Sequence, residues 1–278
     1  MLGHGAPEIV PARCQIMRFL RQTQLFLLLI AFGLIPTNLF AAEPVDLLIV
    51  LAADVSDSID RHSYELQRRG YADALKNPRV LDAIRSGPAG RIAVCLFEWS
   101  NKDLQDIVVD WMVIDGPRAA NQFSDNLLRS PRPIAGATSI SGAIAFAVAQ
   151  LDRAPYYSER RVIDISGDGI NNHGPNPVLA RAEALDRGIT INGLAILNVG
   201  KSSPDYLYLD DGSRDEHRDP DGNLMNYYRD NVIGGPSSFV IHADDFNSFG
   251  EAIVKKLIVE IASDSEGTAH TMLADSER

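Results

Sequence analysis

A run of apolar residues that ends in a cluster of oxygen-bearing side chains constrains this chain more than any other feature. Residues 45–53 read VDLLIVLAA, with only Asp46 polar and no helical period. Such a run is typical of a strand buried on both faces, as in the middle of a parallel sheet. Asp54, Ser56 and Ser58 follow at its carboxyl end, where a tight turn would direct one carboxylate and two hydroxyls to a single point. Three hard oxygens suit Mg²⁺, Mn²⁺ or Ca²⁺ better than a softer metal.

The rest of the chain alternates between strand-like and helix-like segments. Further strands are predicted at residues 91–99, 106–114, 161–166, 189–197 and 238–242, the last as an edge or final strand. Helices are predicted at residues 58–77, 79–85, 118–129, 139–151, 176–187 and 246–261, with a short one at 224–231. This alternation is typical of α/β folds. We therefore predict a doubly wound, mostly parallel central sheet flanked by helices, with ligands beyond the carboxyl ends of the strands.

Two more loops carry oxygen atoms at positions that such a fold would bring near the first. Thr138 ends the sequence GAT at residues 136–138, directly before a predicted helix. Asp168 follows the predicted strand 161–166 and lies between two glycines, which permit a close approach of the backbone to an ion. A threonine hydroxyl and a second carboxylate would therefore join the serines at one edge of the sheet.

Together these three loops resemble the von Willebrand factor type A (vWA) domain and its metal-ion-dependent adhesion site (MIDAS). Their elements, Asp-x-Ser-x-Ser, Gly-x-Thr and a lone Asp, occur in the family's order. The resemblance implies a Mg²⁺ or Mn²⁺ site in which the three hydroxyls bind directly and the two carboxylates lie nearby or act through water. The residues of this predicted site are Asp54, Ser56, Ser58, Thr138 and Asp168.

The mature chain is also similar to an exported bacterial family of unknown function, DUF1194, which itself resembles the A domain. The similarity is carried by FEWS at 97–100, ISGDG at 165–169, Gly193 with its apolar neighbours, and YRDNVIGG at 228–235. One departure from the wider A-domain pattern is Asp57, where a small residue such as glycine is commoner. Its added charge would raise cation affinity or bend the loop.

The amino-terminal residues 1–41 are predicted to be a secretory signal peptide. Arg18 and Arg21 precede an apolar run at residues 25–35, and small residues follow it. Because Met17 stands directly before Arg18, residues 1–16 are interpreted as an over-called start. We expect an exported protein, periplasmic or secreted, with no membrane span after removal of the signal; a retained amino-terminal anchor is the alternative. The mature chain is predicted to form one vWA-like domain at 44–262, with an insertion at 198–236 and a disordered tail at 263–278.

Charge and cysteine content restrict the partners and the chemistry. The net charge is −11, and removal of residues 1–41, which carry three arginines and one glutamate, changes it to −13. Such a surface disfavours nucleic acid and anionic lipid. Cys14 would leave with the signal, so Cys95 is predicted to be a small buried hydrophobe and no disulfide is possible in the mature chain.

Several alternative interpretations remain open from the sequence. Asp54, Thr138 and Ser139 would also serve as helix caps. Asp219-Pro220-Asp221-Gly222-Asn223 is more typical of a turn than of a calcium loop. Glu98 and Trp99 are either packing residues or ligand-facing ones.

Two function classes remain. The first is a binding module, not an enzyme, whose partner is a protein that supplies an acidic side chain to the ion. This follows because three neutral hydroxyls leave the ion with uncompensated positive charge. The alternative is a metal-dependent hydrolase or phosphoryl-transfer enzyme that uses the same ion. For that chemistry His173 is the only candidate base near Asp168, and no Gly-x-Ser-x-Gly or His-Glu-x-x-His pattern occurs.

Overall fold

The chain is described here from a computed structural model, which covers residues 42–131, 136–197 and 224–262. The predicted signal peptide, residues 198–223 of the predicted insertion with its acidic turns, and the predicted tail all lie outside these described residues. Among the residues that are described, no helix is both long enough and apolar enough to cross a membrane.

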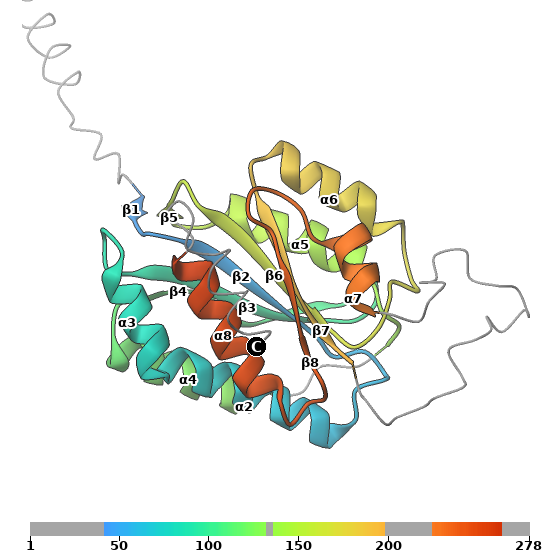
Figure 1. Cartoon of the computed structure of the whole chain (residues 1–278), viewed down its shortest axis with the longest axis horizontal. Coiled ribbons are helices and arrows are strands. Elements are labelled where there is room, and N and C mark those ends of the chain that lie inside the picture. The colour runs from blue at the N-terminus through green and yellow to red at the C-terminus, as the bar shows by residue number, and fades with distance from the viewer. Residues whose placement is uncertain (1–41, 132–135, 198–223, 263–278) are drawn as a thin grey trace, which may run out of the picture. The chain divides into compact units, whose positions relative to one another are not determined.

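A six-stranded sheet forms the centre of the domain, with strand order β4-β3-β2-β6-β7-β8 (Figure 1). Its strands are β2 (Leu48–Asp54), β3 (Ile92–Trp99), β4 (Gln105–Ile114), β6 (Arg161–Gly167), β7 (Thr190–Ile196) and β8 (Val240–Ala243). Every neighbouring pair is parallel except β3 and β4, which are antiparallel. The predicted α/β class with a mostly parallel sheet is therefore confirmed.

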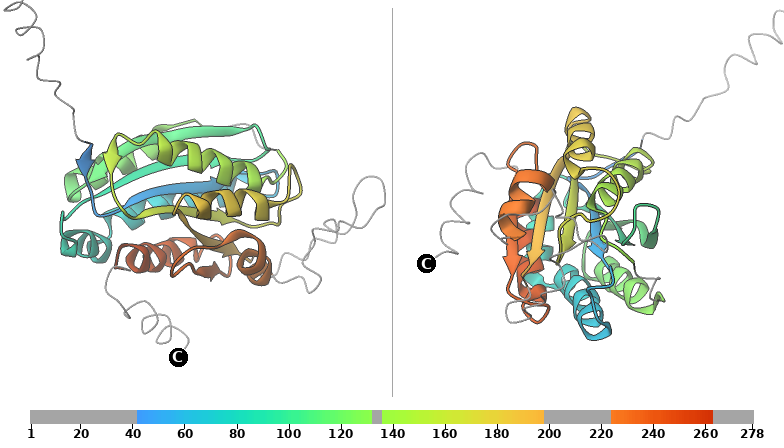
Figure 2. Two further views of the ribbon diagram at one scale, coloured as in Figure 1. Left: turned by 90° about the horizontal axis from the view of Figure 1, so that it is seen from above. Right: turned by 90° about the vertical axis from the view of Figure 1, so that its right-hand side faces the viewer.

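Helices cover both faces of this sheet (Figure 2). One face is covered by α2 (Arg61–Lys76), α3 (Pro78–Ser86), α4 (Pro117–Arg129) and α8 (Phe249–Ala262). The other is covered by α5 (Ile140–Asp152), α6 (Pro177–Asp186), and α7 (Leu224–Tyr227) with the π-helical turn η2 (Tyr228–Val232) that continues it. Residues of β2 alternate between the two cores: Ile49 and Leu51 enter the first, whereas Leu48 and Val50 enter the second. A strand buried on both faces is what the apolar run predicts.

Local hydrogen bonds shift several element boundaries from their predicted positions. The helix predicted from residue 58 begins at Arg61, because Asp60 caps it by accepting a hydrogen bond from Ser63 N at 2.7 Å. The helix predicted from residue 246 begins at Phe249, because a turn closed by Asp245 Oδ1 and Ser248 N precedes it. The predicted helix 224–231 changes from α to π geometry at Tyr228.

A second sheet of two short strands joins the start of the described chain to the main domain. Glu43–Pro44 (β1) pairs in parallel with Tyr156–Tyr157 (β5), and Val45 N donates to Tyr157 O at 2.9 Å. Two-residue strands contain too few positions for a period to be detected, so the sequence did not predict them.

Buried side chains form ion pairs in the core on the face of the sheet covered by α2, α4 and α8. Arg68 on α2 donates to both carboxylate oxygens of Glu98 on β3, at 2.6 and 3.0 Å. Glu98 and Trp99 are both buried, so of the two roles considered for them the structure supports packing. Lys256 on α8 makes ion pairs with Asp164 on β6 and with Glu260, and all three side chains are fully buried.

The buried Asp164 carboxyl is expected to make the free energy of unfolding fall as pH rises. Burial raises the pKa of Asp164 from its ordinary value of 3.8 to about 7, although Lys256 lowers it and Glu260 raises it again. A carboxyl with a raised folded-state pKa contributes stability that is present below its unfolded pKa and is lost as pH rises through the folded value. Between pH 5 and pH 8 this loss is about 3 kcal/mol.

Urea denaturation of the wild type and of Asp164→Asn at pH 5 and pH 8 checks this expectation. The wild type should lose more stability between the two pH values than the variant does. Equal losses in the two proteins would contradict it.

Candidate metal centre

Three loops meet at the carboxyl edge of β2 and β6, which are parallel neighbours with Ala53 opposite Ser166. The first loop, residues 54–58, leaves β2, and the third, residues 167–173, leaves β6. The second loop, residues 136–139, leads into α5. Because the two strands end side by side, their following residues come together at one edge, as the sequence predicts for an α/β sheet.

Hydrogen bonds join the first loop to the third. Ser56 N donates to Asp54 Oδ1 at 2.8 Å, which bends the chain sharply after β2. The hydroxyls of Ser56 and Ser58 lie 3.1 Å apart, and Ser58 Oγ donates to Asp168 Oδ1 at 2.7 Å. Four of the five predicted residues therefore form one continuous polar cluster.

The second loop is held between the other two. Asp57 N donates to Gly136 O at 2.8 Å, Thr138 N donates to Asn172 Oδ1 at 2.8 Å, and Asn172 N donates back to Thr138 O at 2.9 Å. The buried Thr138 hydroxyl faces the third loop, since a Cβ added at Gly169 would lie 3.8 Å from Thr138 Oγ1. The structure thus brings all five predicted residues to one place.

Helix capping does not account for these side chains. Asp60, not Asp54, caps α2, and Ser139, not Thr138, caps α5 by accepting from Gly142 N at 3.3 Å. Asp54 and Thr138 are therefore available for another role.

Asp54 is the most deeply buried carboxyl group of this cluster. Its side chain has 0% exposure, and among the described residues Asp54 Oδ2 has no hydrogen-bond partner. Burial raises the pKa of Asp54 well above its ordinary value, and the negative charge of Asp168 raises it further. The groups that favour its charged form are the backbone and side chain of Ser56, neither of which carries a positive charge.

The other buried carboxylates of the described residues have cationic partners. Glu98 is paired with Arg68, and Asp164 and Glu260 share Lys256. Burying a carboxylate without a counter-charge is unfavourable. Asp54 faces a second carboxylate instead, which sets it apart from the other three.

The donor set restricts which ion fits. Two carboxylates and three hydroxyls offer only oxygen, which suits Mg²⁺ and Mn²⁺ better than softer metals. Consistent with this composition, the described ranges contain no group of three or more His, Cys, Asp and Glu residues that could hold a metal. Asp57 is exposed, and its backbone, through the bond to Gly136, shapes the site.

The third loop contains a histidine, His173, whose ring is engaged in a hydrogen bond. His173 is exposed, and its Nδ1 accepts a hydrogen bond from Lys102 N at 3.2 Å. In the neutral ring Nε2 then carries the proton, which leaves no free lone pair for a general base.

Sequence reasoning missed four residues that support the loops. The side chains of Asn171 and Asn172 accept from Ser141 N and Thr138 N, and Tyr227 Oη accepts from Asn171 N at 3.1 Å. The Tyr228 hydroxyl approaches Asp54, and burial, followed by the charges of Asp54 and Asp168, raises the pKa of Tyr228 well above its usual value. The paired asparagines two residues after Gly169 were the one local signal, whereas the tyrosines lie far away in sequence.

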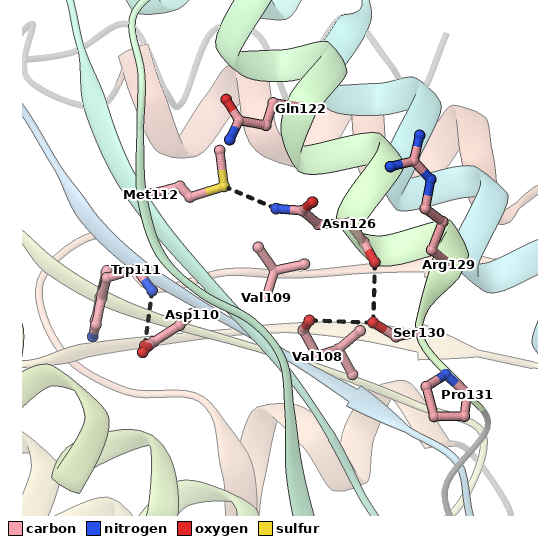
Figure 3. Close-up of a pocket in the computed structure, with 10 residues that line it drawn as sticks. All are labelled: Val108, Val109, Asp110, Trp111, Met112, Gln122, Asn126, Arg129, Ser130 and Pro131. Carbon is pink, nitrogen blue, oxygen red and sulfur yellow. Dashed lines mark hydrogen bonds between the residues drawn. The ribbon is translucent and has the colours of Figure 1, made fainter.

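A separate groove of about 630 Å³ lies between β4 and α4 (Figure 3). Its walls are formed by residues 108–112 of β4, by Gln122, Asn126 and Arg129 of α4, and by Ser130 and Pro131. None of the five candidate residues lines it, so the groove and the candidate metal centre are distinct features.

The sheet order, with helices on both faces, is that of the von Willebrand factor type A fold class. Within that class, the chain belongs to the family described as "Protein of unknown function (DUF1194)", whose model matches residues 44–265. No protein among the curated sequences matches this chain significantly.

Solved structures share the fold at low sequence identity. Proximal thread matrix protein 1 from the mussel byssus matches with a TM-score of 0.52 and 14% identity, over 79% of this chain and 46% of that chain. The pilus adhesin SpaC from Lactobacillus rhamnosus GG gives 0.51 and 15%, over 80% and 31%. A von Willebrand factor type A protein from Catenulispora acidiphila gives 0.51 and 13%, over 78% and 43%. This chain spans less than half the length of each, and one structure of the mussel protein has zinc in its MIDAS motif.

Proposed function

We propose that this protein is an exported, metal-ion-dependent binding module that engages a protein partner through Mg²⁺ or Mn²⁺. The observation that carries the proposal is the fully buried Asp54, which faces the carboxylate of Asp168 and has no compensating cationic side chain among the described residues. A divalent cation at this point removes the repulsion between the two carboxylates. The same ion leaves a coordination position for an oxygen of the partner.

Each candidate residue has a distinct part in this proposal. Ser56, Ser58 and Thr138 bind the ion through neutral hydroxyls, whereas Asp54 and Asp168 provide charge from nearby or through water. The first shell then carries little negative charge, so a Glu or Asp side chain of the partner supplies both charge and oxygen. The chain has more acidic than basic residues, so its surface outside the metal site repels an acidic partner. Electrostatic attraction between the two proteins is therefore confined to the bound ion.

Two structural neighbours and one bound ion support a binding role. Two of the structural neighbours are a thread matrix protein and a pilus adhesin, and the zinc in the mussel MIDAS motif is a precedent for a divalent ion in this class. Export, to the periplasm or the exterior, follows from the predicted signal at residues 1–41. We propose no enzymatic activity, because the His173 ring is already engaged through Nδ1.

Titration with Mg²⁺ or Mn²⁺ alone is expected to reveal one weak site. The Ser56→Ala/Ser58→Ala variant lacks two of the proposed ligands. Its cation affinity should fall at least about tenfold, because the loss of even an outer hydrogen-bonding partner of a metal ligand typically lowers affinity by that much. Isothermal titration calorimetry measures both proteins. Absence of heat with either ion, or an equal affinity in the double variant, would remove the site.

The partner requirement is tested by affinity capture from the exported fraction. Wild type, Asp54→Ala and Asp57→Asn serve as baits, each with Mg²⁺ and with chelator. Asp57→Asn is the matched control, since it removes one negative charge from the same loop at an exposed position. A partner of the proposed kind binds wild type and Asp57→Asn only with Mg²⁺ and does not bind Asp54→Ala. Once the partner is identified, changing its contacting Glu or Asp to Gln or Asn should abolish binding. A complex that persists after this change and in the presence of chelator overturns the mechanism.

A further inference from the structure

Tyr228 reaches the candidate metal centre from a distant part of the chain. It is the first residue of η2 and has 0% exposure. Its ring passes over β7 at Gly193, where an added Cβ would lie 2.7 Å from Tyr228 Cδ1. Its hydroxyl ends against Gly167 at the end of β6, where an added Cβ would lie 2.8 Å away. Both distances are too short for any side chain, so two glycines on neighbouring strands form a slot that this tyrosine fills.

The hydroxyl at the end of this slot faces Asp54. The same Cβ added at Gly167 would lie 2.9 Å from Asp54 Oδ2, so the two oxygens lie against one face of Gly167. Within the described part of the chain neither Tyr228 Oη nor Asp54 Oδ2 has a hydrogen-bond partner. Buried polar atoms are rarely left unpaired, and their shared position allows one water molecule to bridge them.

The backbone around Tyr228 holds it in this position. Ile233 N donates to Tyr228 O at 2.9 Å, the wider bond of a π-helical turn. Such turns are rare and frequently occur at functional sites. The preceding residue, Tyr227, accepts a hydrogen bond from Asn171 N in the third loop at 3.1 Å. Two consecutive tyrosines thus contact the site, one at the third loop and one at Asp54.

We propose that Tyr228 is a positioning residue of the metal centre, whose hydroxyl donates through one water molecule to Asp54 Oδ2 and orients this carboxylate toward the bound cation. The inference rests on the proposed function, because it assigns Tyr228 a role in cation affinity. Hydrogen bonds of this outer kind fix the orientation of metal-binding groups, and their loss typically lowers metal affinity by 10- to 100-fold.

The test compares two tyrosine-to-phenylalanine variants of the full mature chain. Tyr71→Phe is the matched control: Tyr71 is buried, and its hydroxyl is hydrogen-bonded to Ser166 Oγ at 2.8 Å, one residue before Gly167 but on the opposite face of the sheet. Mn²⁺ binding is followed by the electron paramagnetic resonance signal of the free ion. The melting temperature is measured without added cation.

Tyr228→Phe is expected to raise the Mn²⁺ Kd at least about tenfold with a smaller change in melting temperature than Tyr71→Phe, since the Tyr228 hydroxyl makes no direct hydrogen bond to another described residue. Tyr71→Phe is expected to lower the melting temperature and leave the Kd unchanged. An unchanged Kd in Tyr228→Phe, or a melting temperature lowered as in Tyr71→Phe, overturns the role of Tyr228. A wild type that binds no Mn²⁺ overturns the metal centre itself, and with it this inference.

Discussion

Asp168→Ala is expected to abolish cation-dependent binding while the domain stays folded. Asp168 lies in a loop, is only half-buried, and accepts a hydrogen bond from Ser58 Oγ. Its removal leaves no cavity in either core. It also removes the negative charge that raises the pKa of Asp54, so the cation-free variant should be as stable as the wild type or more stable by about 1 kcal/mol.

The loss of affinity should be large, because the site is left with a single carboxylate. We expect a Kd for Mg²⁺ or Mn²⁺ at least about 100-fold higher, which corresponds to roughly 2.7 kcal/mol. Asp57→Asn again provides the control, since an exposed charge in the same loop contributes at most about 1 kcal/mol. Calorimetric titration and thermal melting measure the two effects separately. A melting temperature lowered by more than about 8 °C would instead identify Asp168 as a structural residue.

Lys256→Met is expected to destabilise the fold more than any other single change considered. Lys256 Nζ lies 2.9 Å from Asp164 Oδ1 and also pairs with Glu260, with all three side chains fully buried. Methionine keeps most of the side-chain volume but leaves two buried carboxylates facing each other without a cation. Breaking a buried ion pair in this way costs about 3 to 5 kcal/mol, which lowers the melting temperature of a domain of this size by roughly 10 °C.

The adjacent residue offers a matched control on the same helix. Lys255 is exposed and pairs with Glu251 one turn earlier, so Lys255→Met should change the free energy of unfolding by less than about 0.5 kcal/mol. The defect of Lys256→Met should also be smaller at pH 5 than at pH 8, because protonation of Asp164 removes one of the unpaired charges. Urea denaturation at both pH values measures this. Equal stability losses in the two lysine variants would show that the buried pair contributes little.

Local patterns in the chain were sufficient to predict the fold and to nominate the site. Burial of β2 on both faces appears in the sequence as an unbroken apolar run, and the oxygen-bearing residues stand directly after strands or before a helix. Parallel strands end at a common edge, so their order along the chain already implies that residues 54–58, 138 and 168 come together. Periodicity and turn residues depend on near neighbours, and this is why these features were predictable.

Pairings between distant segments were decided only by the tertiary structure. Asp54 and Asp164 are both aspartates of buried strands, yet one faces Asp168 and the other faces Lys256, which lies on α8. Nothing local distinguishes them, because the charge that each one meets is set by how α8 and the three loops pack on the sheet. The antiparallel direction of β4 and the approach of Tyr228 to Asp54 have the same origin. Residues remote in sequence become neighbours only when helices and strands close around a shared core, and the electrostatics of a buried site depend on those neighbours.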